Sequence, residues 1–302
     1  MNFKSLTILF ILGISTLLST QAQPQQLIKS NDEVLNNAPF IEFLTVKEGQ
    51  ISILDESFEP YFSNLQEREI QVFTGFAPPT SNIENARNFA RTKFASAVTS
   101  FTEDEKASIL FVITEINQLL NKEGLNIITH HPWKLIKIED WLCGGFAHTR
   151  GNYIILSQKH LDNLTQTWSE NMSLEDQKVL VTRLGGLLVH EQFHCLQRTY
   201  KPLFDSLYTS YWGFVKITVE PEKFITVNQI SNPDAPIPEW AFTKDGNYYW
   251  VRTLIKEEVK NPQMGIDFTD VVFALAKEQS KFTVQKDAQG NLKTYRLSDF
   301  PE

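Results

Sequence analysis

The feature that most constrains the fold of this chain is one long helix pattern whose second half is almost uncharged. Ser173, followed three residues later by Asp176, is typical of a helix N-terminus, and the helical pattern continues to about Gln197. Between Leu184 and Gln197 the only charged residue is Glu191. A helix this apolar is buried in a folded protein, so we expect it to lie at the centre of the fold.

Two histidines on this helix are spaced to face the same way. His190 and His194 lie four residues apart and therefore share one helix face. Imidazole is a common ligand of Zn²⁺, so the spacing predicts that both rings bind one zinc ion. Glu191 follows the first histidine and is expected beside the metal, where a carboxylate can accept a proton from water. The alternative is a pair of core histidines with helical spacing.

The segment 187–196 resembles the active-site helix of the zincin metallopeptidases. This resemblance implies a peptidase in which zinc polarises the scissile carbonyl while Glu191 activates water and then protonates the leaving amine. It also implies an edge strand before the helix that aligns the substrate backbone, and residues 153–156 are the candidate. Together with the motifs at 147–150, 207–208, 213–214 and 232–236, this region is similar to poorly characterised secreted bacterial proteins with zincin-like cores.

The third protein ligand that a catalytic zinc needs is left open by the sequence. No histidine stands six residues after His194, and no second helical motif supplies an obvious glutamate. We favour Asp234, because Pro233 sets the turn that carries it. The alternative carboxylates are Asp205, Glu239 and Glu220. If Asp234 is not a ligand, it is a plain turn residue.

Zincins often add a tyrosine or histidine that hydrogen-bonds the transition-state oxyanion. Tyr208 is our candidate for this catalytic role, and an aromatic residue of the core is the alternative. Arg198 is interpreted as a helix-end charge without a catalytic role, and His148 as a surface residue or a neighbour of the metal ligands. Five other aromatic residues either line a cleft or fill the core: Trp212, Trp240, Trp250, Tyr248 and Tyr249.

The first 22 residues are predicted to be a secretory signal peptide. Lys4 precedes an apolar run over residues 6–18, and Ala22 offers a small residue for cleavage. The run is shorter than the roughly 20 residues of a spanning helix, so an uncleaved anchor is the alternative. We therefore expect a secreted or periplasmic protein with no membrane span after cleavage. Cys143 and Cys195 either pair there or remain buried thiols.

The net charge of −8 disfavours nucleic acid as a partner, because an acidic surface repels phosphate. A peptide or protein substrate is expected instead, and the oligomeric state is left open. One alternative is a different zinc-dependent amide hydrolase that acts on a cell-wall peptide or a small amide. Another is a non-catalytic binding protein that retains the zincin core.

The predicted elements indicate an α+β fold. Helices are expected over residues 81–98 and 102–120, strands at 125–128, 133–138 and 153–156, then the long central helix and a shorter helix over 203–211. Strands at 224–227, 241–242 and 248–254 and a hairpin over 285–296 follow. We interpret residues 23–125 as a mostly helical N-terminal lobe. Residues 126–302 would form a zincin-like catalytic region with a small mixed sheet and a mixed C-terminal lobe.

Overall fold

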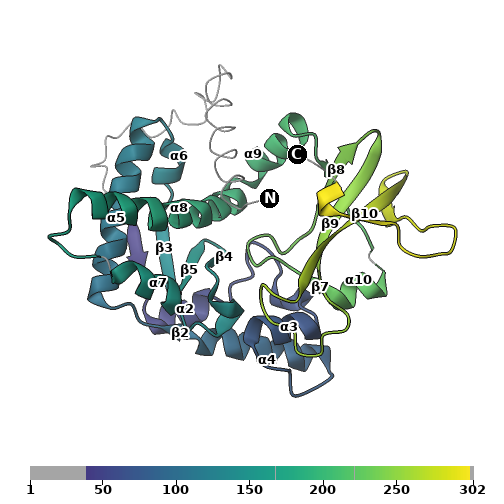
Figure 1. Ribbon diagram of the computed structural model, residues 1–302, viewed down its shortest axis with the longest axis horizontal. Coiled ribbons are helices and arrows are strands. Elements are labelled where there is room, and N and C mark those ends of the chain that lie inside the picture. The colour runs from purple at the N-terminus through teal and green to yellow at the C-terminus, as the bar shows by residue number, and fades with distance from the viewer. Residues whose placement is uncertain (1–38, 167, 221, 300–302) are drawn as a thin grey trace.

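A computed structural model describes residues 39–166, 168–220 and 222–299. Within these residues the chain forms nine α-helices and two β-sheets, so the predicted α+β class is confirmed. Figure 1 shows the sheets in separate lobes, with α8 (Leu174–Thr199) crossing the first lobe and α9 (Lys201–Ser206) following it. The predicted signal peptide lies outside the described residues. No helix in the described part of the chain is long and apolar enough to cross a membrane.

The first sheet has the order β1-β3-β5-β4, with β2 pairing alongside β3. Its strands are β1 (Ile41–Phe43), β2 (Val98–Thr99), β3 (Trp133–Ile138), β4 (His148–Arg150) and β5 (Tyr153–Ser157). β5 lies between the parallel β3 and the antiparallel β4, so the prediction that residues 153–156 form the edge strand is wrong. β4 occupies that edge. The physical reason is visible in β5, where Ile154, Ile155 and Leu156 are all buried, as in an internal strand covered on both faces.

Helices cover both faces of the first sheet. They are α2 (Val46–Ser52), α3 (Glu67–Thr74), α4 (Ile83–Ser96), α5 (Glu103–Lys122), α6 (Asn126–Thr129), α7 (Gln158–Thr165) and α8. Because successive strand side chains point to opposite faces, Leu135 packs with α5 and α8 while Ile136 packs with α3 and α4. The predicted N-terminal lobe contributes β1, β2 and α2–α5 to this arrangement.

The long helix α8 begins where the sequence predicts. Ser173 accepts a hydrogen bond from the Asp176 backbone N–H, and the helix buries one side against α5. At Gly185 an added Cβ would lie 3.1 Å from the side chain of Ile116 on α5, which is closer than ordinary packing allows. The missing side chain therefore permits the close approach of the two helices.

Two predicted strands are helices in the structure. Residues 125–128 fall mostly in α6, which follows the end of α5 at Gly124 with a φ of 76°. Residues 224–227 lie within α10 (Lys223–Asn228). Both predictions rested on apolar runs of about four residues, and such runs do not distinguish a strand from one helical turn.

The second sheet has the order β11-β10-β9-β8-β6. Its strands are β6 (Val215–Lys216), β7 (Gln229–Ile230), β8 (Trp240–Lys244), β9 (Asn247–Ile255), β10 (Phe268–Glu278), β11 (Lys281–Val284) and β12 (Thr294–Arg296). Asp245 and Gly246 join β8 to β9 with φ values of 51° and 76°, as a tight two-residue hairpin requires. Trp250 and Phe273 pack in the core of this lobe.

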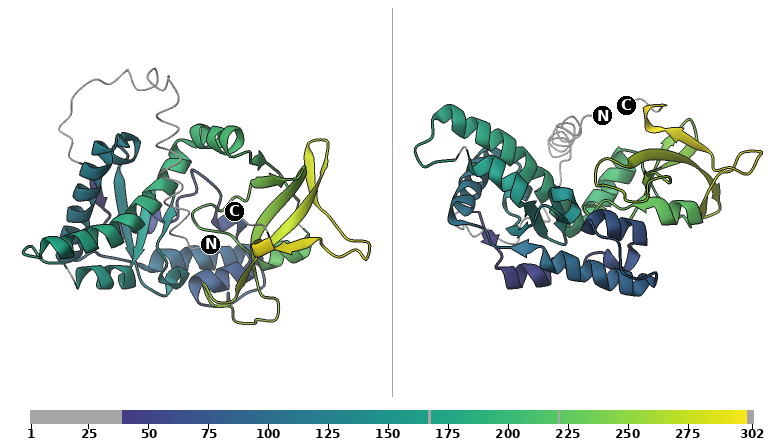
Figure 2. Two further views of the ribbon diagram at one scale, coloured as in Figure 1. Left: turned by 45° about the horizontal axis from the view of Figure 1, so that its top comes forward. Right: turned by 60° about the horizontal axis from the view of Figure 1, so that its bottom comes forward.

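Polar contacts join the two lobes beneath their junction, where the dark-blue α3 and α4 lie in Figure 2. Arg68 donates to the carbonyl oxygens of Lys256 and Val259 at 3.0 and 2.6 Å. The buried carboxylate of Glu69 accepts the backbone N–H of Ser231 at 2.5 Å. The segment that enters β8 is thereby held to the helices of the first lobe.

Both cysteines are buried free thiols, which is the second of the two predicted alternatives. Cys143 and Cys195 belong to different core clusters, on opposite faces of the first sheet. Burial raises the pKa of Cys195 to about 12 and also raises the pKa of Cys143. Thiols held protonated in this way are unreactive at neutral pH.

Candidate active site

The second half of α8 presents two half-buried histidines on a helix that is otherwise packed into the core. Leu188, Cys195 and Leu196 are fully buried against the first sheet and α5, which sets the rotation of the helix about its axis. His190 and His194 therefore emerge together on one face, as their spacing predicts.

The two imidazoles meet through their Nε2 atoms, which lie 3.2 Å apart. The ring planes are nearly perpendicular at 86°. If one zinc ion were bonded to both nitrogens at about 2.1 Å, a separation of 3.2 Å would correspond to a nitrogen–zinc–nitrogen angle of about 100°, which is close to tetrahedral. Burial, and then the charge of His194, lower the pKa of His190, which favours the neutral ring that metal binding requires. The pair fits two ligands of one zinc ion.

Gln197 controls the tautomer of His194. Its amide oxygen lies 2.7 Å from Nδ1 of His194, and an amide oxygen can only accept a hydrogen bond. Nδ1 must therefore carry the proton, which leaves the lone pair on Nε2, the atom that faces His190. The Gln197 amide nitrogen donates to the Tyr208 hydroxyl at 2.5 Å. Such a hydrogen bond to the distal ring nitrogen is typical support for a metal-binding histidine.

We predict that Gln197→Leu weakens zinc binding about 10–100-fold, because it removes the acceptor that holds His194 in the ligand tautomer. Gln197→Glu retains an acceptor at the same position and serves as the matched control, with zinc affinity near that of the wild type. Competition against a chromophoric chelator measures both variants. Equal zinc affinity of the Leu variant and the wild type would show that Gln197 does not position His194.

Glu191 carries a buried carboxylate, and no ion pair to it is formed by the described residues. Its side chain is 2% exposed, and Oε2 has no hydrogen-bond partner among the described residues. Burial raises its pKa well above the usual range, the charge of Asp234 raises it further, and Arg198 opposes the shift. A carboxyl group held this way gains a proton more readily than an exposed one.

Asp234 lies beside the histidines and remains ionised. The backbone N–H and the hydroxyl of Thr149 both donate to its Oδ1, at 2.6 and 2.8 Å. Burial alone would raise its pKa, but the charges of His194 and His148 and the bond from Thr149 lower it overall. Because both bonds from Thr149 go to Oδ1, Oδ2 is the oxygen of Asp234 that could bind a further group.

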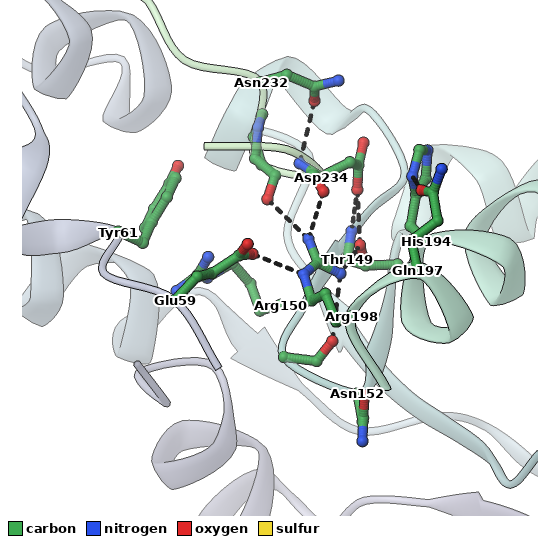
Figure 3. Close-up of polar contacts among 12 residues, drawn as sticks. Glu59, Tyr61, Thr149, Arg150, Asn152, His194, Gln197, Arg198, Asn232 and Asp234 are labelled. Carbon is green, nitrogen blue, oxygen red and sulfur yellow. Dashed lines mark hydrogen bonds and ion pairs between the residues drawn. The ribbon is translucent and has the colours of Figure 1, made fainter. Parts of the chain in front are cut away.

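Arg198 holds the parts of this site together, as Figure 3 shows. Its Nε donates to Glu59 at 2.6 Å, and Nη1 donates to the Thr149 hydroxyl at 2.6 Å. Nη2 donates to the backbone carbonyls of Asp234 and Pro233 at 2.7 and 3.2 Å. The side chain is 6% exposed. Arg198 does lie in the last turn of α8, but it is a buried junction of four chain segments rather than a solvated helix-end charge.

His148 is a buried residue of the edge strand β4. It is 2% exposed, its Nδ1 donates to the carbonyl of Phe146 at 3.0 Å, and its Nε2 has no partner among the described residues. Its charge acts on the pKa of Asp234, so the two groups are neighbours. Of the two predicted environments for His148, the structure therefore supports the one next to the candidate ligands.

The alternative carboxylates do not reach the histidine pair. Asp205 and Glu239 both form ion pairs with Lys201 and Lys216, including Asp205–Lys216 at 2.9 Å and Glu239–Lys216 at 3.3 Å. Glu220 is exposed near the second sheet. Among the four predicted carboxylates, Asp234 is the one whose charge interacts with both histidines: it acts on the pKa of His190, and His194 acts on the pKa of Asp234.

The described residues do not contain a group of three or more His, Cys, Asp or Glu side chains arranged to hold a metal ion. The structure thus brings two predicted ligands together and places Asp234 nearby without completing a third position. Tyr208 contacts Gln197, and its ring stacks on Trp212 at 5.5 Å. Its link to the histidines therefore passes through Gln197.

Three residues that contact members of the candidate site were not identified from the sequence: Gln197, Thr149 and Glu59. Helical spacing was a usable signal for Gln197, which lies three residues after His194, and also for Arg198, which lies four residues after it. Thr149 and Glu59 reach the site from distant segments, and no local pattern indicates them.

Comparison of the chain with protein-family models, with curated proteins and with solved structures gives no match.

Proposed function

We propose that this chain is an exported zinc-dependent hydrolase of amide bonds, with peptides as its substrates. His190, His194 and Asp234 would hold the metal, and Glu191 would be the general base. The observation that carries the proposal is the pair of imidazoles that face each other at 3.2 Å on the same helix as Glu191, whose buried Oε2 has no partner among the described residues. An unsatisfied buried carboxylate is costly to stability, so a catalytic role accounts for it better than a structural one.

The proposed mechanism assigns one task to each side chain. A bound zinc ion supplies Lewis-acid polarisation of the substrate carbonyl and makes water more acidic. Glu191 accepts a proton from water, and its raised pKa allows it to pass that proton to the leaving amine. The ionised Asp234 offers negative charge to the cation, and Arg198 holds the Asp234 backbone in place. Gln197 keeps the His194 lone pair on Nε2.

We also propose that the first sheet and α8 form a zincin-like core. The support is the arrangement itself: parallel strands β1, β3 and β5, an antiparallel edge strand β4, and the histidine-bearing helix packed against one face. Tyr208 remains a candidate for oxyanion stabilisation, because it is hydrogen-bonded to Gln197 and borders the site.

One observation favours the second candidate function, hydrolysis of a small amide. An extended peptide commonly binds an edge strand through the free backbone groups of that strand. On β4 the outward N–H of Thr149 is already bonded to Asp234. A short substrate that needs no strand pairing suits this edge better than a long unfolded chain.

The metal assignment is tested by zinc content. We expect about one zinc ion per chain after purification. His194→Ala and Asp234→Ala should lose most of it, because each removes a ligand. Asp205→Ala and Glu239→Ala serve as matched controls and should retain zinc, since their carboxylates pair with lysines. Elemental analysis of the wild type and the four variants decides the point, and full zinc in Asp234→Ala would remove Asp234 from the ligand set.

The reaction is tested by digestion of a peptide library and of N-acylated amino-acid amides, with and without a chelator. We expect hydrolysis that the chelator abolishes and added zinc restores. Preference for short amides would support the second candidate. Zinc binding without hydrolysis of either class would indicate a binding protein.

A further inference from the structure

A cleft of about 320 Å³ opens beside the histidine site, between the end of α8 and the segment that enters β8. Its wall includes Gln197, Arg198 and Asp234, so the cleft is continuous with the candidate active site. Six aromatic residues also line the cleft, and we call four of them, Tyr208, Trp212, Phe214 and Trp240, the aromatic wall.

The chain conformation gathers these rings. Leu207–Tyr211 form a π-helical turn, a rare conformation that is frequent at functional sites, and Gly213 ends it at a φ of 69°. The ring of Tyr208 stacks on Trp212 at 5.5 Å and 25°, and it meets Trp240 edge-on at 5.2 Å and 76°. All four rings of the aromatic wall are half-buried, so each keeps part of its surface toward solvent.

The charges that line the cleft are already paired. Lys201 pairs with both Asp205 and Glu239, and Arg198 pairs with Glu59 at 2.6 Å. The remaining charge is Asp234, whose Oδ1 already accepts two hydrogen bonds from Thr149. A charged ligand group would find no free counter-charge among these lining residues and would lose its hydration, whereas a neutral apolar group would replace water against aromatic surface.

The size of the cleft limits the ligand. Cavities of about 150 Å³ accept a benzene ring, and ligand pockets usually begin near about 300 Å³. A volume of about 320 Å³ accommodates one aromatic side chain with its adjoining amide group, but not several residues.

We propose that the aromatic wall binds the side chain of a neutral aromatic amino-acid amide or of a short peptide with an aromatic residue. The ring of the ligand stacks on Trp212 and Tyr208, while its amide group extends toward Asp234 and His194. Binding is a property of the cleft alone. The assignment of that amide as the bond to be cleaved rests on the proposed function.

The test is direct binding of three probes: the N-acetyl amides of phenylalanine, alanine and lysine. Calorimetry and saturation-transfer NMR are carried out on the Glu191→Gln chain, in which turnover is suppressed, and again on chelator-treated wild type. We expect the phenylalanine amide to bind about tenfold or more tightly than the other two amides, with or without zinc.

Trp212→Ala should abolish most of this preference. Tyr211→Ala is the matched control, because Tyr211 is the aromatic residue that directly precedes Trp212, is 59% exposed and is not among the residues that line the cleft. Should Trp212→Ala fail to fold, Ala235→Phe fills the cleft from an exposed position and should block binding of the phenylalanine amide.

Equal binding of the three amides, or an undiminished preference in both Trp212→Ala and Ala235→Phe, would overturn the proposal. If probe binding fails while zinc-dependent hydrolysis persists, the cleft assignment is wrong and the proposed function stands. If the phenylalanine amide binds but zinc binding and hydrolysis are absent, the cleft assignment stands and the proposed function is wrong.

Discussion

Glu191→Gln should lower the rate of amide hydrolysis by about 10²–10⁴-fold while zinc content stays near that of the wild type. Glutamine keeps the shape of the side chain but cannot accept a proton from water. Steady-state kinetics with elemental analysis measures both properties on one sample. His194→Ala is the comparison, because it should lose zinc and activity together. If Glu191→Gln releases zinc as readily as His194→Ala, the general-base assignment is wrong and Glu191 is part of a structural site.

The same variant has an expected effect on stability that depends on pH. Burial raises the pKa of Glu191, so the folded state favours its protonated form. The wild type therefore loses stability as pH rises from the unfolded pKa of about 4.3 through the higher folded value. A glutamine side chain does not titrate, so Glu191→Gln should gain stability relative to wild type as the pH rises above the unfolded pKa of about 4.3. Chemical denaturation of the metal-free wild type and variant over a series of pH values measures this difference.

Arg198→Ala should destabilise the protein by about 3–5 kcal/mol, because it leaves the largely buried Glu59 carboxylate without its partner. It also removes the donors to the carbonyls of Pro233 and Asp234, so the turn that carries Asp234 loses its anchor. Arg183→Ala is the matched control, since Arg183 lies on the same helix but is exposed, and its cost should stay within about 0.5 kcal/mol. Urea denaturation of both variants measures the difference.

Arg198→Lys separates charge from geometry. Lysine keeps the positive charge beside Glu59, but its single ammonium group cannot reproduce the forked contacts to Thr149 and the carbonyl of Asp234. We expect partial recovery of stability together with weaker zinc binding than in the wild type. Wild-type stability in Arg198→Ala would show that the buried ion pair contributes nothing, and that Asp234 is held by Thr149 alone.

Two long helices with clear N-terminal signals were predicted well. The helix α5 begins at a capping box formed by Thr102 and Glu105, and α8 begins at Ser173, both as expected. The helix α4, expected from residue 81, has Asn82 as its N-cap and begins at Ile83. Errors fell on short apolar runs, which became α6 and α10. The helices α2, α3 and α7 and the strands β1, β4 and β10 were not predicted.

What the sequence alone determined is the part of the site that lies on one helix. The 3.6-residue period places His190 and His194 side by side, and the scarcity of charge around Glu191 predicts its burial. The tertiary structure decided which distant groups complete the site. Glu59 reaches Arg198 across 139 residues, and Asp234 reaches Thr149 across 85. These contacts arise from the packing of several elements into one core, and no periodic pattern in the chain encodes them, whereas helical neighbours are set by backbone geometry alone.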